Sequence, residues 1–247
     1  MKRLITLAAT FLVLGASSAM AQSGLTMYWD NCSDGGANQK TFACAVNTGS
    51  DIFYVSVVIP SSMPSFAASS AIIDMTFEDA GIPAWWQTLG GQCRANAIGM
   101  TFDPLNFTTN CGDVWQGSAN LSVFQPQQGT NVQGHGANTL RLNSGAAIPA
   151  GSEIALTADG SELVVGKVTI THSKTVGTGA CAGCTTPVCI VLNECKLQQP
   201  AGVGDFTVTN EAAGKTRSLT FNGTPANCPT NTPTQNRTWG AVKSLYR

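Results

Sequence analysis

The chain opens with the pattern of a secretory leader, and this leader decides how its nine cysteines are interpreted. Lys2 and Arg3 precede an apolar run from Leu4 to Leu14, and small residues then lead to the A-x-A cleavage site Ala19-Met20-Ala21. The run has about half of the ~20 residues that a membrane-spanning helix needs, so we expect residues 1–21 to be removed as a signal peptide. Export to an oxidising compartment favours disulfides over free thiols. The mature chain is therefore expected to be secreted, whether to the periplasm, the cell surface or the medium, and to be stapled by disulfides.

Two pairs of cysteines flank short segments that can fold back on themselves. Cys32 and Cys44 enclose a turn-rich loop and Cys93 and Cys111 enclose residues 94–110, so we expect a local bridge in each place, adding ~3 kcal/mol in the chain-entropy model. Cys195 is expected to be the unpaired thiol, because it lies deepest in an apolar run where a small hydrophobic side chain packs well. Spacing leaves the pairing of the last five cysteines open, and those that remain after Cys195 are Cys181, Cys184, Cys189 and Cys228.

Metal sites are the alternative interpretation of two segments. Cys181, Cys184, Cys189 and Cys195 could surround zinc, but zinc sites usually repeat the C-x2-C knuckle and the second half here is C-x5-C. Asp30, Asp34 and Gly35 fit a calcium loop, but its third and twelfth positions are Cys32 and Thr41. We therefore expect neither a metal nor a cofactor.

Short β-branched runs of period two, separated by Gly, Pro, Asn and Ser, predict strands throughout the mature chain. The expected strands are Ile52–Ile59, Ala71–Phe77, Ala97–Phe102, Asn120–Phe124, Thr139–Asn143, Glu153–Thr157, Glu162–His172, Val188–Leu197, Asp205–Thr209 and Thr216–Phe221. In Glu162–His172, the side chains of Val164, Val168 and Ile170 are expected to share the buried face. The predicted fold is an all-β antiparallel sandwich, immunoglobulin-like or cohesin-like, formed by one domain over residues 22–227.

Charge excludes one class of partner. The mature chain would carry 11 basic and 14 acidic residues with no basic cluster, whereas phosphate binding needs clustered Lys and Arg. Nucleic acid is therefore not expected as a partner. No second apolar stretch reaches membrane-spanning length either, so no transmembrane segment is expected.

The adjacent indoles of Trp85 and Trp86 are the candidate ligand-binding residues. Neighbouring residues in an extended backbone point to opposite faces, so one ring would fill the core while the other stacks on a sugar or another partner. The alternative is that both rings pack under loops near Cys93.

The sequence contains few residues in patterns typical of catalytic sites. His135 and His172 would serve as bases only beside a nucleophile or an acid, and no G-x-S-x-G or H-E-x-x-H motif is present. A carboxylate pair for glycoside hydrolysis could be drawn from Asp74, Glu78, Asp79, Asp103 and Asp113. A carbohydrate-active enzyme with such a pair near the two indoles is thus the alternative function, and no catalytic residue is assigned.

The C-terminus differs from the rest of the chain. A Pro, Thr and Asn run from Cys228 to Arg237 is typical of a linker, and Trp239, Val242 and Tyr246 then fall on one face at helical spacing. Residues 228–247 are therefore expected to be a linker and a short tail that docks to export or surface machinery, with capping of the sandwich as the alternative. The segment C-A-G-C-T-T-P-V-C-I-V-L-N and the ending T-W-G-A-V-K-S-L-Y-R resemble a group of uncharacterised secreted bacterial proteins, which implies export and a β-rich fold.

The expected function is a secreted or cell-surface, non-enzymatic binding or structural module. Its partner would be a glycan or a protein of the cell surface or matrix.

Overall fold

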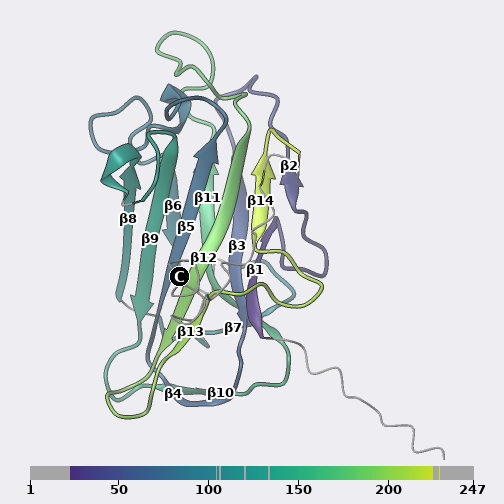
Figure 1. Ribbon diagram of the computed structural model, residues 1–247, viewed down its shortest axis with the longest axis vertical. Helices are drawn as coiled ribbons and strands as arrows, with labels where there is room; N and C mark the ends of the chain where they lie inside the picture. The colour runs from purple at the N-terminus through teal and green to yellow at the C-terminus, as the bar shows by residue number, and fades with distance from the viewer. Residues whose placement is uncertain are drawn as a thin grey trace, which may run out of the picture.

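The structure is a computed structural model that describes residues 23–224, except 104, 106, 120 and 133, together with Cys228. The expected leader and the tail beyond Cys228 lie outside these residues. Two sheets pack face to face, and the larger one faces the viewer in Figure 1. Sheet A has the order β1-β3-β11-β6 with β7 beside β11, and sheet B has the order β2-β14-β12-β5-β9-β8 with β13 beside β12. The two-stranded pair of β10 and β4 forms a separate small sheet.

The strand bounds confirm the predicted antiparallel sandwich. The ladders are antiparallel except for two short parallel pairs, β7 with β11 and β2 with β14. The bounds are β1 Gly24–Trp29, β2 Gln39–Lys40, β3 Ser50–Val58, β4 Met63–Phe66, β5 Ala68–Phe77, β6 Ile98–Thr101, β7 Gly112–Asp113, β8 Leu121–Gln128, β9 Thr139–Ala147, β10 Ile154–Leu156, β11 Glu162–Thr171, β12 Val188–Gln198, β13 Phe206–Val208 and β14 Ser218–Phe221; two 3-10 turns cover Ala84–Trp86 and Gly129–Asn131.

All ten expected strands are present, but the sequence did not predict β1, β2, β4 and β7. Strand β1 is buried on both faces, so it lacks the alternation by which a half-exposed strand is recognised. Its inner face joins the core through Leu25 and Met27. Its edge is covered by the loop before β14, where the Leu25 N–H donates to the carbonyl of Asn210 at 2.8 Å.

A β-bulge in β11 corrects the expected side-chain pattern of this strand. Val164 lies opposite Ser56 and Gly166 lies opposite Val55, so Val165 is the extra residue. A one-residue shift exchanges the two faces of a strand. Val165 therefore joins Val168 and Ile170 in the core, and Val164 turns to the outer face of sheet A.

Four disulfides staple the sandwich, and two of them correct the local pairing that was expected. Cys32 is bonded to Cys111 and Cys44 to Cys184, instead of Cys32 to Cys44 and Cys93 to Cys111. The other bridges are Cys93–Cys181 and Cys189–Cys228, and Cys195 is the cysteine left free. Tertiary proximity rather than loop length decides these pairs, because the sandwich brings together, at each bridge, two segments that are distant in sequence. Since Cys181, Cys184 and Cys189 are all bridged, the zinc interpretation is wrong.

The free thiol is expected to be unreactive in the folded chain. Cys195 is fully buried between the sheets, and burial raises the pKa of its thiol to about 12. Only ~10⁻⁴ of it would be thiolate at pH 8, and the thiolate is the reactive form. At pH 8, we expect no thiol of the folded, unreduced chain to react with Ellman's reagent. After denaturation without reduction, one thiol per chain should react. Three or more thiols in the denatured, unreduced chain would contradict the four bridges.

Candidate functional site

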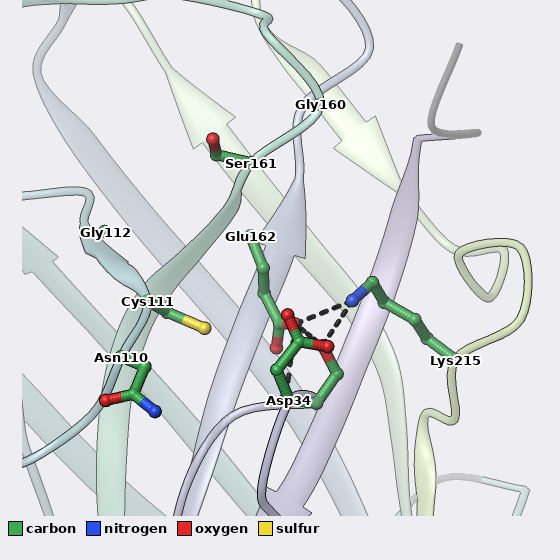
Figure 2. Close-up of a pocket in the computed structure, with 9 residues that line it drawn as sticks. Asp34, Asn110, Cys111, Gly112, Gly160, Ser161, Glu162 and Lys215 are labelled. Carbon is green, nitrogen blue, oxygen red and sulfur yellow. Dashed lines mark hydrogen bonds and ion pairs between the residues drawn. The ribbon is translucent and has the colours of Figure 1, made fainter. Parts of the chain in front are cut away.

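The outer face of sheet A is covered around Tyr54, Ser56 and Val164, and a small polar pocket remains at that end of it. Phe107 packs edge-on against Tyr54 at a centroid distance of 6.2 Å, and the Cys32–Cys111 bridge ties the same covering loop to the loop after β1. The pocket encloses about 240 Å³ and is lined by Ser33, Asp34, Asn110, Cys111, Gly112, Gly160, Ser161, Glu162 and Lys215. In Figure 2 the side chains of Glu162 and Lys215 converge, with Asn110 and Cys111 on the other side of the pocket.

The bulge in β11 is what brings Glu162 to this pocket. Glu162 precedes the bulge and lies on the outer face, opposite Val58. Its side chain is only 4% exposed. The carboxylate accepts a hydrogen bond from the Thr26 hydroxyl at 2.6 Å and another from the Ser33 hydroxyl. Lys215 lies 3.2 Å from the same carboxylate and also donates to the Ser33 oxygen. The site is thus a closed ring of ammonium, hydroxyl and carboxylate.

This ring has a clear structural effect. It joins β1 and the loop after it to β11 and to the loop before β14, which are far apart in sequence. Lys215 is neutralised by Glu162, and the hydroxyl of Ser33 is held between the two groups. An ion pair of this kind, with a buried and fully partnered carboxylate and a partly exposed ammonium, holds together the segments it joins. The pocket was not predicted, because its charged residues come from three separate parts of the sequence.

Trp85 and Trp86, the predicted ligand platform, are both fully buried. The Trp85 ring packs against Trp86 at 4.8 Å and against Phe221 at 6.1 Å between centroids, and its indole N–H donates to the Thr175 hydroxyl at 2.9 Å. Residues Ala84–Trp86 form a 3-10 turn rather than an extended segment, so the two side chains do not point to opposite faces. The exposed-indole interpretation is wrong, and the packed alternative describes both rings.

The carboxylates considered for glycoside hydrolysis lie on β5, in the loop directly after it, in the loop after β6 and on β7. Asp74 lies on the outer face of sheet B, where Arg141 binds both of its oxygens at 2.7 and 2.8 Å and Asn193 donates to it at 2.7 Å. Asp113 is the last residue of β7, and its carboxylate accepts hydrogen bonds from the N–H groups of Trp115 and Gly117. These carboxylates hold the structure together locally. The others are Glu78, Asp79 and Asp103, of which Asp79 accepts the Thr186 hydroxyl.

Each histidine has an acidic neighbour in space. His135 lies 3.4 Å from Asp74 and 2.9 Å from an Arg141 nitrogen. His172 lies 2.9 Å from Asp51, and its other ring nitrogen faces the carbonyl of Thr48 at 3.0 Å. Both ring nitrogens of His172 are therefore engaged with acceptors, as expected of a histidine that secures a loop. Within the described residues, no group of three or more His, Cys, Asp or Glu side chains is placed to hold a metal ion.

Within the described part of the chain, no other sheet packs on the outer face of sheet B, which faces the viewer in Figure 1. At its β8 edge, the side chains of Leu121 and Val123 are 70% and 60% exposed. Across the ladder they lie opposite Ala147 and Gly145, so the neighbouring strand adds little bulk. The amides of Gln125 and Asn143 form the next pair along the strands. The result is a flat aliphatic patch bordered by neutral polar groups, here called the β8 patch (residues 121, 123, 145 and 147).

The described residues contain no helix that is long and apolar enough to cross a membrane. No protein-family model matches the sequence, and a search of curated proteins finds no match. Two solved structures align with most of the chain. The second type II cohesin module from the cellulosomal adaptor ScaA scaffoldin of Acetivibrio cellulolyticus covers 83% of this chain and 98% of its own length, with 10% identity and a TM-score of 0.34. The seventh ScaB type I cohesin from Pseudobacteroides cellulosolvens covers 84% and 96%, with 11% identity and a TM-score of 0.29. Scores this low assign neither a family nor a partner.

Proposed function

We propose that this chain is an exported, non-enzymatic binding module that holds a protein partner on the β8 patch. One observation carries the proposal: Leu121 and Val123 stand side by side on one face of an edge strand and are mostly exposed to water. Exposed aliphatic side chains that adjoin each other on a flat surface mark interaction sites, whereas isolated ones do not.

The chemistry of the β8 patch favours a protein over a glycan. Sugar recognition commonly relies on the exposed face of an aromatic ring, and the indoles of Trp85 and Trp86 lie in the core. An aliphatic centre with a border of amides, as Gln125 and Asn143 supply here, is the usual composition of a protein interface.

Export is supported by the covalent structure and by the leader pattern. Four disulfides that link sequence-distant loops persist where the surroundings are oxidising. The resemblance of the Cys181–Asn193 segment to secreted bacterial proteins points the same way.

Site-specific cross-linking tests the binding role. A photo-reactive phenylalanine derivative would replace Val123 in one variant and Val203 in a control, since Val203 is 48% exposed on the loop between β12 and β13. Both variants would be exported from the native host and irradiated in culture. We expect position 123 to give a cross-linked protein of defined mass and position 203 to give none.

A third variant sharpens this experiment. Leu121→Asp in the position 123 background places a charge in the β8 patch without disturbing the core, because Leu121 is 70% exposed. We expect the cross-linked product to fall at least tenfold, as one unpaired charge at an aliphatic contact costs more than ~1.4 kcal/mol. Equal products from positions 123 and 203, no product from either, or an unchanged product in the Leu121→Asp variant would each contradict the proposed function.

A further inference from the structure

Strand β8 leaves one side of its backbone unpaired within the described part of the chain. Its eight residues run in unbroken antiparallel register with β9. The N–H of Ile148 donates to the carbonyl of Ala67, on the β5 side, at 2.8 Å. Hydrogen-bonding direction alternates along a strand, so the N–H of Ala147 points to the other side, toward β8. Leu121, which lies opposite Ala147, therefore bonds inward to β9.

The same alternation turns the backbone N–H and C=O groups of Ser122 and Phe124 away from the sheet. Pro126 agrees with this assignment independently, because a proline in an edge strand occupies a position whose missing N–H faces outward. Among the described residues, none forms a backbone hydrogen bond with these outward groups. Before Pro126, which has no N–H to donate, the free edge thus offers two donors and two acceptors.

From Leu121 to Gln125, before Pro126, the edge also lacks the features that normally keep two edges apart. Proteins protect exposed edge strands with charged side chains, prolines or bulges. The sequence of β8, Leu-Ser-Val-Phe-Gln-Pro-Gln-Gln, contains no charged residue, and its register with β9 shows no bulge. The mature chain would carry an excess of acidic residues, so two copies repel each other over much of their surface. Across this neutral strip they can approach without placing like charges opposite each other.

We infer that the partner bound at this edge is a second copy of the same chain, joined by antiparallel pairing of β8 with β8; the inference rests on the proposed function. One register uses the outward N–H and C=O groups of both Ser122 and Phe124. Ser122 exchanges hydrogen bonds with Phe124 of the other copy, and Phe124 with its Ser122, around a two-fold axis at Val123. The Val123 side chains then lie opposite each other, with Leu121 of each copy diagonal to Val123 of the other. Pro126 lies beyond the last bond.

The pairing of one strand buries little surface, so the dimer is expected to be weak. Interfaces of less than ~1,200 Å² in total are typical of transient association. Sedimentation velocity of the exported, disulfide-bonded chain, at concentrations up to about 1 mM, should therefore show a mass that doubles as concentration rises.

A matched pair of variants at Ser122 isolates the backbone bond. Ser122→Pro removes the outward N–H and leaves the ladder with β9 intact, whereas Ser122→Ala keeps that N–H. We expect the first to raise the dissociation constant at least tenfold, because each copy loses a hydrogen bond of ~1 kcal/mol and gains a steric block. The second should change it by less than about threefold. Thermal midpoints of all three chains should agree, which shows that the monomer fold is kept.

Concentration-dependent amide exchange covers the case in which Ser122→Pro disturbs the fold. In the unchanged chain, the N–H groups of Ser122 and Phe124 should become protected as concentration rises, while that of Val203 should not. A chain that stays monomeric throughout, a dimer equally affected by both variants, or exchange at Ser122 that is independent of concentration would each overturn the inference. Cross-linking from position 123 to a different protein alone would overturn it while leaving the proposed function standing.

Discussion

Removing the disulfide between Cys44 and Cys184 is expected to lower the free energy of unfolding by about 4 kcal/mol. The two cysteines are 140 residues apart, but the Cys32–Cys111 and Cys93–Cys181 bridges shorten the closed loop to about 33 residues. The loss comes mainly from the larger conformational freedom of the unfolded chain. The measurement is guanidinium unfolding of the Cys44→Ala/Cys184→Ala chain under non-reducing conditions, followed by fluorescence of the buried indoles.

The control for this variant is Cys195→Ala. It removes a buried sulfur but no covalent link, so we expect a loss of about 1 kcal/mol from the small cavity. If the double variant lost no more than this control, the Cys44–Cys184 bridge would not constrain the unfolded chain as the structure requires.

The pairing of cysteines shows which part of the fold is readable from local sequence. The strands Ile52–Ile59 and Val188–Leu197 were predicted because alternation and β-branching are local properties, and both are present as β3 and β12. Cys32 and Cys44 lie close in sequence, yet each bonds to a cysteine more than 70 residues away. That choice depends on which loops the two sheets bring together, and sequence spacing contains no such information.

The direction of side chains was the second feature that the sequence could not predict. The alternation predicted for β11 is correct after Val165 and reversed before it, because a single bulge exchanges the two faces of the strand. Glu162 reaches its partners, Ser33 and Lys215, only through that reversal. The same kind of limit applies to β8: its strand was predicted, but its place at the edge of sheet B, which exposes Val123, follows from strand order alone.

Arg94→Ala is expected to destabilise the fold by about 4 kcal/mol, which for a chain of this size corresponds to a fall of roughly 8 to 16 °C in thermal midpoint. Arg94 is 1% exposed, and its guanidinium lies 3.5 Å from the centre of the Trp85 ring. It donates to the carbonyls of Trp85 at 2.6 Å and of Ser173 at 2.8 Å, and also to that of Thr171. These contacts join the loop that carries both indoles to the end of β11.

The cost of this substitution has two sources. Loss of the long side chain leaves a cavity beside Trp85, and three carbonyl groups lose their donor in a region that is poorly accessible to water. Burial lowers the pKa of Arg94 to about 10, so the side chain still carries its charge at pH 7 and the carbonyls and the ring face compensate its lost hydration. A smaller, neutral side chain such as alanine reproduces neither the hydrogen bonds to the carbonyls nor the contact with the Trp85 ring.

Two further variants separate charge from geometry in this contact. Arg94→Lys keeps the charge and the aliphatic stem but cannot donate to three carbonyls in the plane of a guanidinium, so we expect it to lose about 2 kcal/mol. Arg217→Ala also removes bonds to two carbonyls, those of Leu192 and Thr209, but at a more exposed position, and should cost about 1 kcal/mol. Differential scanning calorimetry of the three variants gives the order of the losses. If Arg94→Ala proved no more destabilising than Arg217→Ala, the guanidinium would not be what holds the indole-bearing loop against the end of the sandwich.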